Sequence, residues 1–202
     1  MNSEISSSKY WNNIYNAKKD VWTLNNPNPV LVQIVEGKKI APPGKILVAG
    51  SGKGDDAIYL AQKGFDVSAI DFSEEAINFS SKLAENEGVV VNFMQNDLFS
   101  IKTDFPDEFD FIYEYVTLCA IDPDRIEELI EAITSALKVN GLFVTIPFPI
   151  DKREGGPPFT IELERFYNIA CKYLKLEYYA KDINSVKPRK GKEVLMIFKK
   201  RE

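Results

Sequence analysis

The chain has 202 residues, 45% of them hydrophobic and 27% charged, a composition typical of one globular domain that buries its own core. Its formal net charge of -5 disfavours nucleic acid as a partner, because phosphate backbones attract basic surfaces. Cys119 and Cys171 have neither metal-site nor disulfide spacing, and histidine, the commonest metal ligand, is absent. We therefore expect no bound metal.

The sequence also bears on location. No apolar run approaches the roughly 18 residues that a membrane span needs, so we expect no membrane partner. Residues 1–8 are polar and rich in serine, without the apolar run of a secretory signal. Together with two reduced cysteines, these features favour a cytoplasmic protein, and the sequence is compatible with a monomer.

The first forty residues differ in composition from the rest. They contain both tryptophans, Trp11 and Trp22, among asparagine, lysine and serine. Pro29 precedes an apolar stretch at residues 30–35, which predicts a helix of about two turns because proline fits a first helical turn. We therefore divide the chain into an N-terminal lid segment, residues 1–40, and a domain of residues 41–202.

Strand and helix signals alternate from residue 45 onward. Apolar runs typical of buried strands predict five strands, at residues 45–49, 66–70, 89–94, 109–115 and 142–146. Helical patterns are found at residues 55–61, after Ser73, at 124–138 and at 161–170. This alternation predicts an α/β fold with a doubly wound, mostly parallel sheet, whose ligands bind beyond the carboxyl ends of the strands.

Two further strands complete a predicted seven-stranded sheet. They lie at residues 175–181 and 193–199, and the connection between them, residues 182–192, has no helical pattern. Parallel neighbours need a crossover, whereas antiparallel neighbours can be joined by a loop. The last pair therefore predicts one antiparallel strand.

A glycine-rich turn, residues 50–54 (GSGKG), follows the first strand and opens a helix. Such a turn lets the backbone approach a ligand closely, and Asp71 at the end of the second strand can accept both hydroxyls of a ribose. A dinucleotide would place its pyrophosphate at the helix start, where Asp55 and Asp56 would repel it. S-adenosylmethionine is therefore favoured, with a dinucleotide or a tight turn without ligand as the alternatives.

Polar and aromatic residues also follow the next strands. Asp97 can accept a hydrogen bond from an adenine amino group, with Leu98 as an apolar wall, and a turn residue is the alternative interpretation of Asp97 taken alone. Glu114 and Tyr115 end the fourth strand and are predicted near the mouth of a pocket. Packing at the edge of the core is the alternative for the tyrosine.

Several motifs together resemble one family. In chain order they are the aromatic residues Trp11, Tyr15 and Trp22, Asn28-Pro29, residues 47–54 (LVAGSGKG), residues 69–73 (AIDFS), residues 114–121 (EYVTLCAI), residues 155–159 (GGPPF) and residues 188–192 (PRKGK). The chain resembles a class I S-adenosylmethionine-dependent methyltransferase of the thiopurine methyltransferase family, in its halide/thiol methyltransferase branch. The resemblance runs from about residue 11 to residue 199 and implies a Rossmann-like fold with a helical N-terminal lid.

This resemblance implies S-adenosyl-L-methionine as the cofactor and S-adenosyl-L-homocysteine as its product. The predicted cofactor contacts are Trp11, Tyr15, Trp22, Gly50, Ser51, Gly52, Gly54, Asp71, Phe72, Asn96, Asp97, Leu98 and Tyr115. The candidate substrate-pocket residues, none of them assigned as catalytic, are Glu114, Thr117, Leu118, Phe148 and Pro157. Tyr15 and Phe148 depart from the tryptophan and tyrosine usual in the branch.

The implied reaction is direct methyl transfer to a small soft nucleophile, such as a thiol, bisulfide, a halide or thiocyanate. The charges of the sulfonium and of the anion both fade in the transition state, so a water-excluded pocket of low polarity helps. Two alternatives stay open. One is a methyltransferase of the same fold that acts on an amine, tellurite or a thiopurine-like heterocycle, and the other is a non-catalytic cofactor-binding protein.

Three remaining features have simpler interpretations. Residues 155–159 resemble the loop of enzymes that methylate adenine in nucleic acid, but that loop would follow the fourth strand rather than the fifth, and a stiff surface turn is the alternative. A solvated loop is favoured over attraction of an anionic substrate for the basic cluster of Lys187, Arg189, Lys190 and Lys192. Cys119 has no histidine to activate it, which favours core packing.

Overall fold

The computed structural model describes residues 5–201, so residues 1–4 of the lid segment lie outside the described residues. The chain divides into two units, Met1–Leu98 and Phe99–Glu202. The strands form a seven-stranded sheet in the order β3-β2-β1-β4-β5-β7-β6. Among residues 5–201, no helix has the length and apolarity needed to cross a bilayer. The predicted fold class, an α/β sheet that is mostly parallel, is confirmed.

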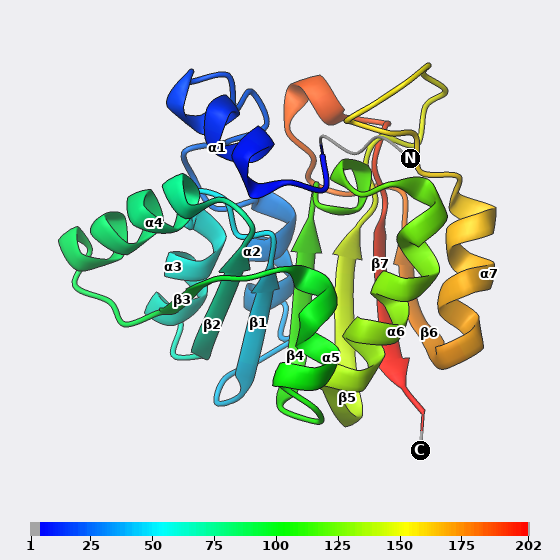
Figure 1. Ribbon diagram of the computed structural model, residues 1–202. Helices are drawn as coiled ribbons and strands as arrows, with labels where there is room; N and C mark the ends of the chain where they lie inside the picture. Colours follow the sequence, from blue (N-terminus) through cyan, green and yellow to red (C-terminus); the bar gives the residue numbers. More distant parts are fainter. Residues whose placement is uncertain (1–4, 202) are drawn as a thin grey trace. The chain divides into compact units, whose positions relative to one another are not determined.

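In the first unit three strands are parallel. They are β1 (Lys45–Ala49), β2 (Asp66–Asp71) and β3 (Asn92–Gln95). In the register of the sheet, Ala69 of β2 lies between Val48 and Phe93. The helices α3 (Asp55–Gln62) and α4 (Glu74–Asn86) contact β2, as Figure 1 shows. Buried apolar residues along β1 form the core that places the glycine turn at the end of this strand.

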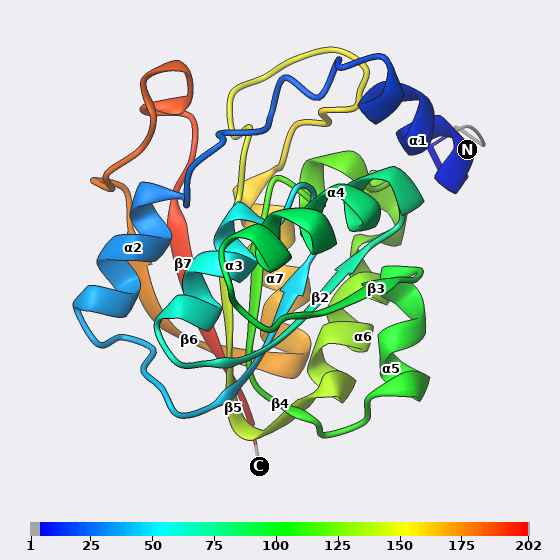
Figure 2. The same ribbon diagram turned by 90° about the vertical axis from the view of Figure 1, so that its left-hand side faces the viewer.

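The described part of the lid segment, residues 5–40, contains two helices. The predicted helix at residues 30–35 is confirmed as α2 (Pro29–Glu36), whose first turn is capped by the Asn28 side chain. The other helix, α1 (Ser8–Asn16), agrees with the helical lid that the resemblance implied, although its bounds were not predicted, and none of its residues is buried. Both views show α1 beside α4 (Figure 1, Figure 2).

The second unit contains the other four strands. They are β4 (Phe109–Tyr115), β5 (Leu137–Ile146), β6 (Leu174–Ala180) and β7 (Leu195–Lys200). β4 and β5 are parallel, and β7 runs antiparallel to both β5 and β6, which confirms the antiparallel strand predicted near the C-terminus. Three helices accompany them: α5 (Ile101–Asp104), α6 (Ile126–Ala136) and α7 (Leu163–Tyr173). α6 contacts both α5 and α7 (Figure 1).

Several predicted boundaries were wrong. β3 begins at Asn92 rather than at residue 89, because residues 84 and 89 form a hydrogen bond that closes the end of α4. β5 begins at Leu137, earlier than the predicted residue 142, because Leu137 already pairs with Phe109 of β4. Asn140 was expected to stop a helix there, but with a φ of 66° it lies within this strand.

Candidate functional site

The glycine turn after β1 is held by backbone hydrogen bonds. The N–H of Ser51 donates to the carbonyl of Ile70 at 2.8 Å, and the N–H of Gly54 donates to that of Ser51 at 3.0 Å. Gly54 has a φ of 86°, which glycine adopts without strain. A Cβ atom there would lie 2.7 Å from the Cβ atom of Ser80 on α4. Gly54 is therefore required for the close packing of the turn against α4. Gly54 is buried, whereas Gly50 and Ser51 are half-buried.

The Ser51 side chain offers an unused polar group in this turn. Its hydroxyl oxygen is buried and has no hydrogen-bond partner among residues 5–201. A buried hydroxyl without a partner destabilises the protein unless a ligand or water satisfies it. Ser51 is therefore suited to contact a ligand held by the turn.

Asp71 ends β2 beside the turn and is buried. Its two carboxylate oxygens accept the N–H groups of Gly52, at 2.7 Å, and Ser73, at 2.9 Å. Burial raises the pKa of Asp71 above its ordinary value, and these backbone N–H groups partly offset that rise. Each oxygen keeps a second lone pair, so the carboxylate can accept further hydrogen bonds from a ligand.

Three aromatic residues predicted as cofactor contacts come together in the lid segment. The ring centroid of Trp22 lies 6.0 Å from that of Trp11 and 5.9 Å from that of Tyr15, with both pairs near perpendicular. A Cβ atom on Gly52 would lie 3.2 Å from the Tyr15 hydroxyl oxygen, so Tyr15 closely approaches the glycine turn. Burial and then the charge of Asp71 raise the pKa of Tyr15, which keeps its hydroxyl protonated.

Polar contacts that the sequence did not reveal fasten the lid segment to the rest of the first unit. The Ser73 hydroxyl donates to the side-chain oxygen of Asn12 at 2.6 Å, so α1 is bound at the start of α4. The N–H of Asn28 donates to Asp56 on α3, also at 2.6 Å. Both contacts join residues far apart in the chain, and a local pattern could not have indicated them.

The residues predicted around the adenine lie after β3. The N–H of Asn96 donates to the carbonyl of Asp71 at 3.1 Å, and its side-chain oxygen accepts the N–H of Asp97 at 2.8 Å. Asp97 is exposed, Leu98 is buried and Phe72 is half-buried. The backbone thus fixes Asn96 close to Asp71, whereas an adenine contact by Asp97 stays a prediction.

In the second unit, Glu114 clasps the loop that follows β4. Its carboxylate is fully buried and accepts hydrogen bonds from the N–H groups of Thr117, at 2.7 Å, and Leu118, at 2.9 Å, and from the Thr145 hydroxyl, at 2.6 Å. Burial raises the pKa of Glu114. This arrangement favours a role in positioning the half-buried Thr117 and the buried Leu118, rather than direct contact with a substrate.

The same loop contains an unusual backbone conformation. Val116 has a φ of 57°, which is strained for a β-branched residue and persists only where the surroundings enforce it. The hydrogen bonds from Thr117 and Leu118 to Glu114 provide that enforcement. The conformation of Val116 turns the chain sharply just after Tyr115.

Tyr115 belongs to a cluster that sequence reasoning only partly found. Its hydroxyl donates to the buried carboxylate of Glu193 at 3.2 Å. The guanidinium carbon of Arg189 lies 4.9 Å from the centroid of the Tyr115 ring and 5.1 Å from that of Phe148. Burial raises the pKa values of both Tyr115 and Glu193. Tyr115 was predicted as a cofactor contact and Phe148 as a substrate-pocket residue, whereas no role was predicted for Glu193.

The solvated-loop interpretation of the basic cluster is wrong for Arg189. Arg189 is only 6% exposed, whereas Lys187 and Lys190 are exposed as expected. A short 3-10 turn, η4 (Lys187–Arg189), carries the arginine inward while its neighbours stay in water. The P-R-K-G motif was the signal in the sequence, but basic composition alone cannot distinguish one buried arginine from its exposed neighbours.

The Gly155–Phe159 loop returns to the segment after β4. The N–H of Phe159 donates to the carbonyl of Cys119 at 2.8 Å, and Pro157 is half-buried. A Cβ atom on Gly156 would overlap the Phe159 ring.

Cys119 is buried, and its thiol donates to the carbonyl of Val116 at 3.2 Å. Burial raises the pKa of this thiol to about 12, which favours the interpretation of Cys119 as a core-packing residue.

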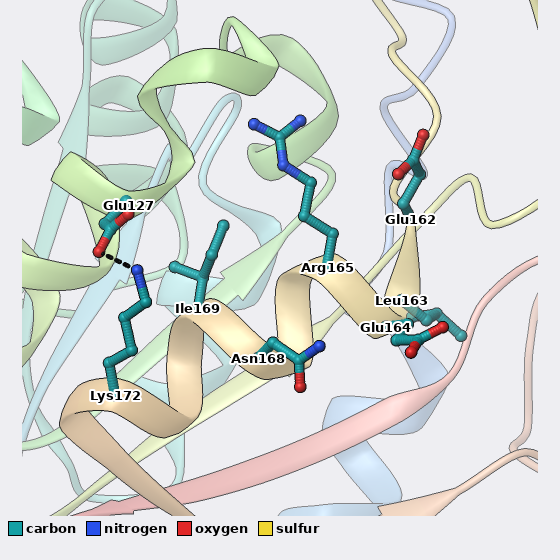
Figure 3. Close-up of a pocket in the computed structure, with 8 residues that line it drawn as sticks. All are labelled: Glu127, Glu162, Leu163, Glu164, Arg165, Asn168, Ile169 and Lys172. Carbon is teal, nitrogen blue, oxygen red and sulfur yellow. Dashed lines mark hydrogen bonds and ion pairs between the residues drawn. The ribbon is translucent and has the colours of Figure 1, made fainter.

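A surface hollow lies along α7 (Figure 3). It is lined by Glu127, Glu162, Leu163, Glu164, Arg165, Asn168, Ile169 and Lys172. None of these residues was predicted at the site, and Lys172 forms an ion pair of 2.6 Å with Glu127. The charged groups of Glu127 and Lys172 in this hollow thus already neutralise each other, and the hollow is not taken as the candidate site.

The chain is similar over most of its length to known methyltransferases. The family model for thiopurine S-methyltransferase matches residues 6–201. Probable thiol methyltransferase 2 of Arabidopsis thaliana is 30% identical over 201 residues, which cover 96% of this chain and 86% of that protein. Thiocyanate methyltransferase 1 of Brassica oleracea is 30% identical over 186 residues, which cover 89% of this chain and 79% of that protein.

A solved structure shows the shared fold. It is that of 1,6-didemethyltoxoflavin-N1-methyltransferase from Burkholderia thailandensis with 1,6-didemethyltoxoflavin and S-adenosylhomocysteine bound. It matches with a TM-score of 0.73 and 21% sequence identity, over 96% of this chain and 87% of that one.

Proposed function

Because the chain belongs to the thiopurine S-methyltransferase family and is an S-adenosylmethionine-dependent methyltransferase, we propose that it methylates a small soft nucleophile. The acceptor classes are thiols, bisulfide, halides and thiocyanate. The relatives named for thiol and thiocyanate methylation support this choice. We further propose a cytoplasmic enzyme without a nucleic-acid partner, given its free cysteines and net acidic chain.

The observation that carries the acceptor class is the buried guanidinium of Arg189 over two aromatic rings. Its distances to the centroids of Tyr115 and Phe148 are 4.9 and 5.1 Å. A guanidinium is weakly hydrated and stacks on aromatic faces, so it suits an anion that is itself polarisable and weakly hydrated. Thiolates, iodide and thiocyanate have these properties.

The first unit provides the groups that fit the cofactor. S-adenosylmethionine, when bound, supplies a methyl group activated by a positively charged sulfur. The spare lone pairs of Asp71 can accept ribose hydroxyls, and the unpartnered Ser51 hydroxyl can satisfy a polar group of the ligand. Trp11, Tyr15 and Trp22 provide aromatic faces that exclude water and attract a cation.

The second unit offers little for removing a proton from the acceptor. The Glu114 carboxylate is held in place by the N–H groups of Thr117 and Leu118 and by the Thr145 hydroxyl. Burial raises the pKa of Cys119 to about 12. Glu193 already accepts the Tyr115 hydroxyl. We therefore propose that the acceptor arrives ionised, and that the residues mainly align it with the methyl group and exclude water.

An acceptor screen tests this proposal. Purified protein with S-adenosylmethionine is incubated with thiols, bisulfide, iodide, thiocyanate, tellurite, amines and thiopurines, and S-adenosylhomocysteine is quantified. We expect product with thiols, bisulfide, iodide and thiocyanate. Product with amines alone would contradict the acceptor class, and no product with any acceptor would favour a cofactor-binding protein.

A further inference from the structure

Lys53 lies between the glycines of the turn, and its ammonium group reaches the lid segment. Its Nζ atom is 2.7 Å from Oδ2 of Asp20, and the two side chains are only 21% and 6% exposed. The same Nζ atom lies 5.0 Å from the centroid of the Phe79 ring on α4. The ion pair is thus largely shielded from water, where such a pair is stronger than on an open surface.

Asp20 in turn organises the part of the lid segment that carries Trp22. Its Oδ2 atom accepts the Thr23 hydroxyl at 2.7 Å, and its carbonyl accepts the N–H of Thr23 at 3.0 Å. Burial alone would raise the pKa of Asp20, but the Lys53 ammonium and the Thr23 hydroxyl hold it below its ordinary value. The carboxylate is therefore charged near neutral pH and closes the turn around Trp22.

These contacts connect the glycine turn to the aromatic cluster at two points. One is the ion pair of Lys53 with Asp20, two residues before Trp22. The other is the approach of the Tyr15 hydroxyl to Gly52, next to Lys53. Trp22 lies against Tyr15, so the two connections share one aromatic pair.

We propose that Lys53 is a positioning residue that fastens the lid segment to the glycine turn through Asp20 and thereby slows release of the cofactor. This inference rests on the proposed cofactor role of the aromatic cluster. Lys53 touches neither acceptor nor methyl group in this account. It also faces Asp55 at the start of α3, whose pKa burial raises and the lysine charge lowers.

The test uses full-length protein with Lys53→Met, Asp20→Asn and the double substitution. Methionine keeps an apolar chain against Phe79, and asparagine keeps an acceptor for Thr23. We expect each single variant to raise the Kd for S-adenosylhomocysteine by about five- to tenfold, through faster dissociation in stopped-flow measurements. The double variant should bind as the single variants do, because the two residues act as one pair.

A matched control is available in Lys63→Met. Lys63 also lies over an aromatic ring, that of Tyr59 at 5.3 Å, but its ion pair with Glu36 measures 4.0 Å between exposed side chains. We expect no change in Kd for this variant. The KM for S-adenosylmethionine should rise in Lys53→Met while kcat is preserved, which a general loss of folding would not produce.

A second readout needs no cofactor. The chain has two tryptophans, Trp11 and Trp22, both in the lid segment, so their fluorescence reports on that segment alone. Acrylamide should quench both Lys53→Met and Asp20→Asn more strongly than the wild type, with Lys63→Met unchanged. If wild type fails to bind S-adenosylhomocysteine, the proposed function fails while quenching still tests the fastening. Wild-type quenching in the variants, or additive effects in the double variant, would overturn the role of Lys53.

Discussion

At the scale of single residues, Asp71 gives the most direct test of the cofactor contacts. Removing its carboxylate in Asp71→Ala deletes charge-assisted hydrogen bonds worth about 1.5–3 kcal/mol each, so affinity for S-adenosylhomocysteine should fall by at least about tenfold. Calorimetry measures the affinity. Asp71→Asn keeps the shape of the side chain and should bind with intermediate affinity, and unchanged binding in both variants would exclude the ribose contact.

Arg189 provides the corresponding test on the acceptor side. Its guanidinium lies over Tyr115 and Phe148, so Arg189→Met keeps apolar bulk there but removes the positive charge. We expect the KM for thiocyanate to rise by about tenfold or more, since a partly desolvated charge pair is worth over 1 kcal/mol, while the Kd for S-adenosylhomocysteine is unchanged. Steady-state kinetics and calorimetry separate the two.

A matched control for Arg189 is Lys190→Met in the same loop, where the side chain is exposed. Its KM for thiocyanate should stay close to that of the wild type. Equal effects of the two substitutions would mean that general positive charge, rather than the buried guanidinium, attracts the acceptor.

Local patterns located some residues correctly in the fold, because the position of these residues depends on their neighbours in the chain. Asp71 and the glycine turn are both set by the strand that precedes them. Arg189 and Glu193 were harder, because their burial comes from β4 and from Phe148, far away in the sequence. A charged residue is buried only when distant partners are in place, which a local pattern does not encode.

At the scale of elements, the lid segment can be removed. Deleting residues 1–23 takes away α1 and the aromatic cluster but leaves the strands of the first unit intact. We expect a folded protein, by circular dichroism and thermal unfolding, that binds S-adenosylhomocysteine much more weakly. Affinity equal to that of the full-length chain would show that Trp11, Tyr15 and Trp22 do not cover the cofactor.

The Gly155–Phe159 loop tests the acceptor side at the same scale. Gly156→Ala places a methyl group against the Phe159 ring, which must move and disturb its backbone contact with Cys119. Because this contact lies in the second unit, we expect a several-fold rise in acceptor KM and no change in cofactor Kd. Lys152→Ala, at an exposed position just before the loop, is the control, and equal KM values in both variants would contradict a role for the loop.

Elements with a clear apolar period were predicted with small errors in their ends, as for α6 and β4. The resemblance implied a helical lid, but the bounds of α1 were not predicted from the local pattern, because its contacts are polar and aromatic rather than buried and apolar. The early start of β5 was missed because pairing with Phe109 overrides the local turn signal at Asn140. Tertiary pairing, rather than propensity, decides such segments.

At the scale of the whole molecule, the strand order and the family explain why the protein uses S-adenosylmethionine. The buried Arg189 and the aromatic rings beside it are the basis for the proposed acceptor. The chain has no histidine, and Glu114 and Cys119 are held in packed positions. The central claim is therefore that the acceptor already carries its negative charge when it binds. Thiocyanate carries its charge at every working pH, whereas a thiol must first lose a proton.

The measurement that tests this claim most directly is the pH dependence of kcat/KM for thiocyanate and for a series of thiols. We expect almost no change for thiocyanate between about pH 6 and 9, whereas each thiol should follow its own thiolate fraction. Glu114→Gln and Glu193→Gln should leave these midpoints in place. A single midpoint shared by every acceptor, thiocyanate included, and displaced in either variant, would show that the enzyme supplies a base and would contradict the account.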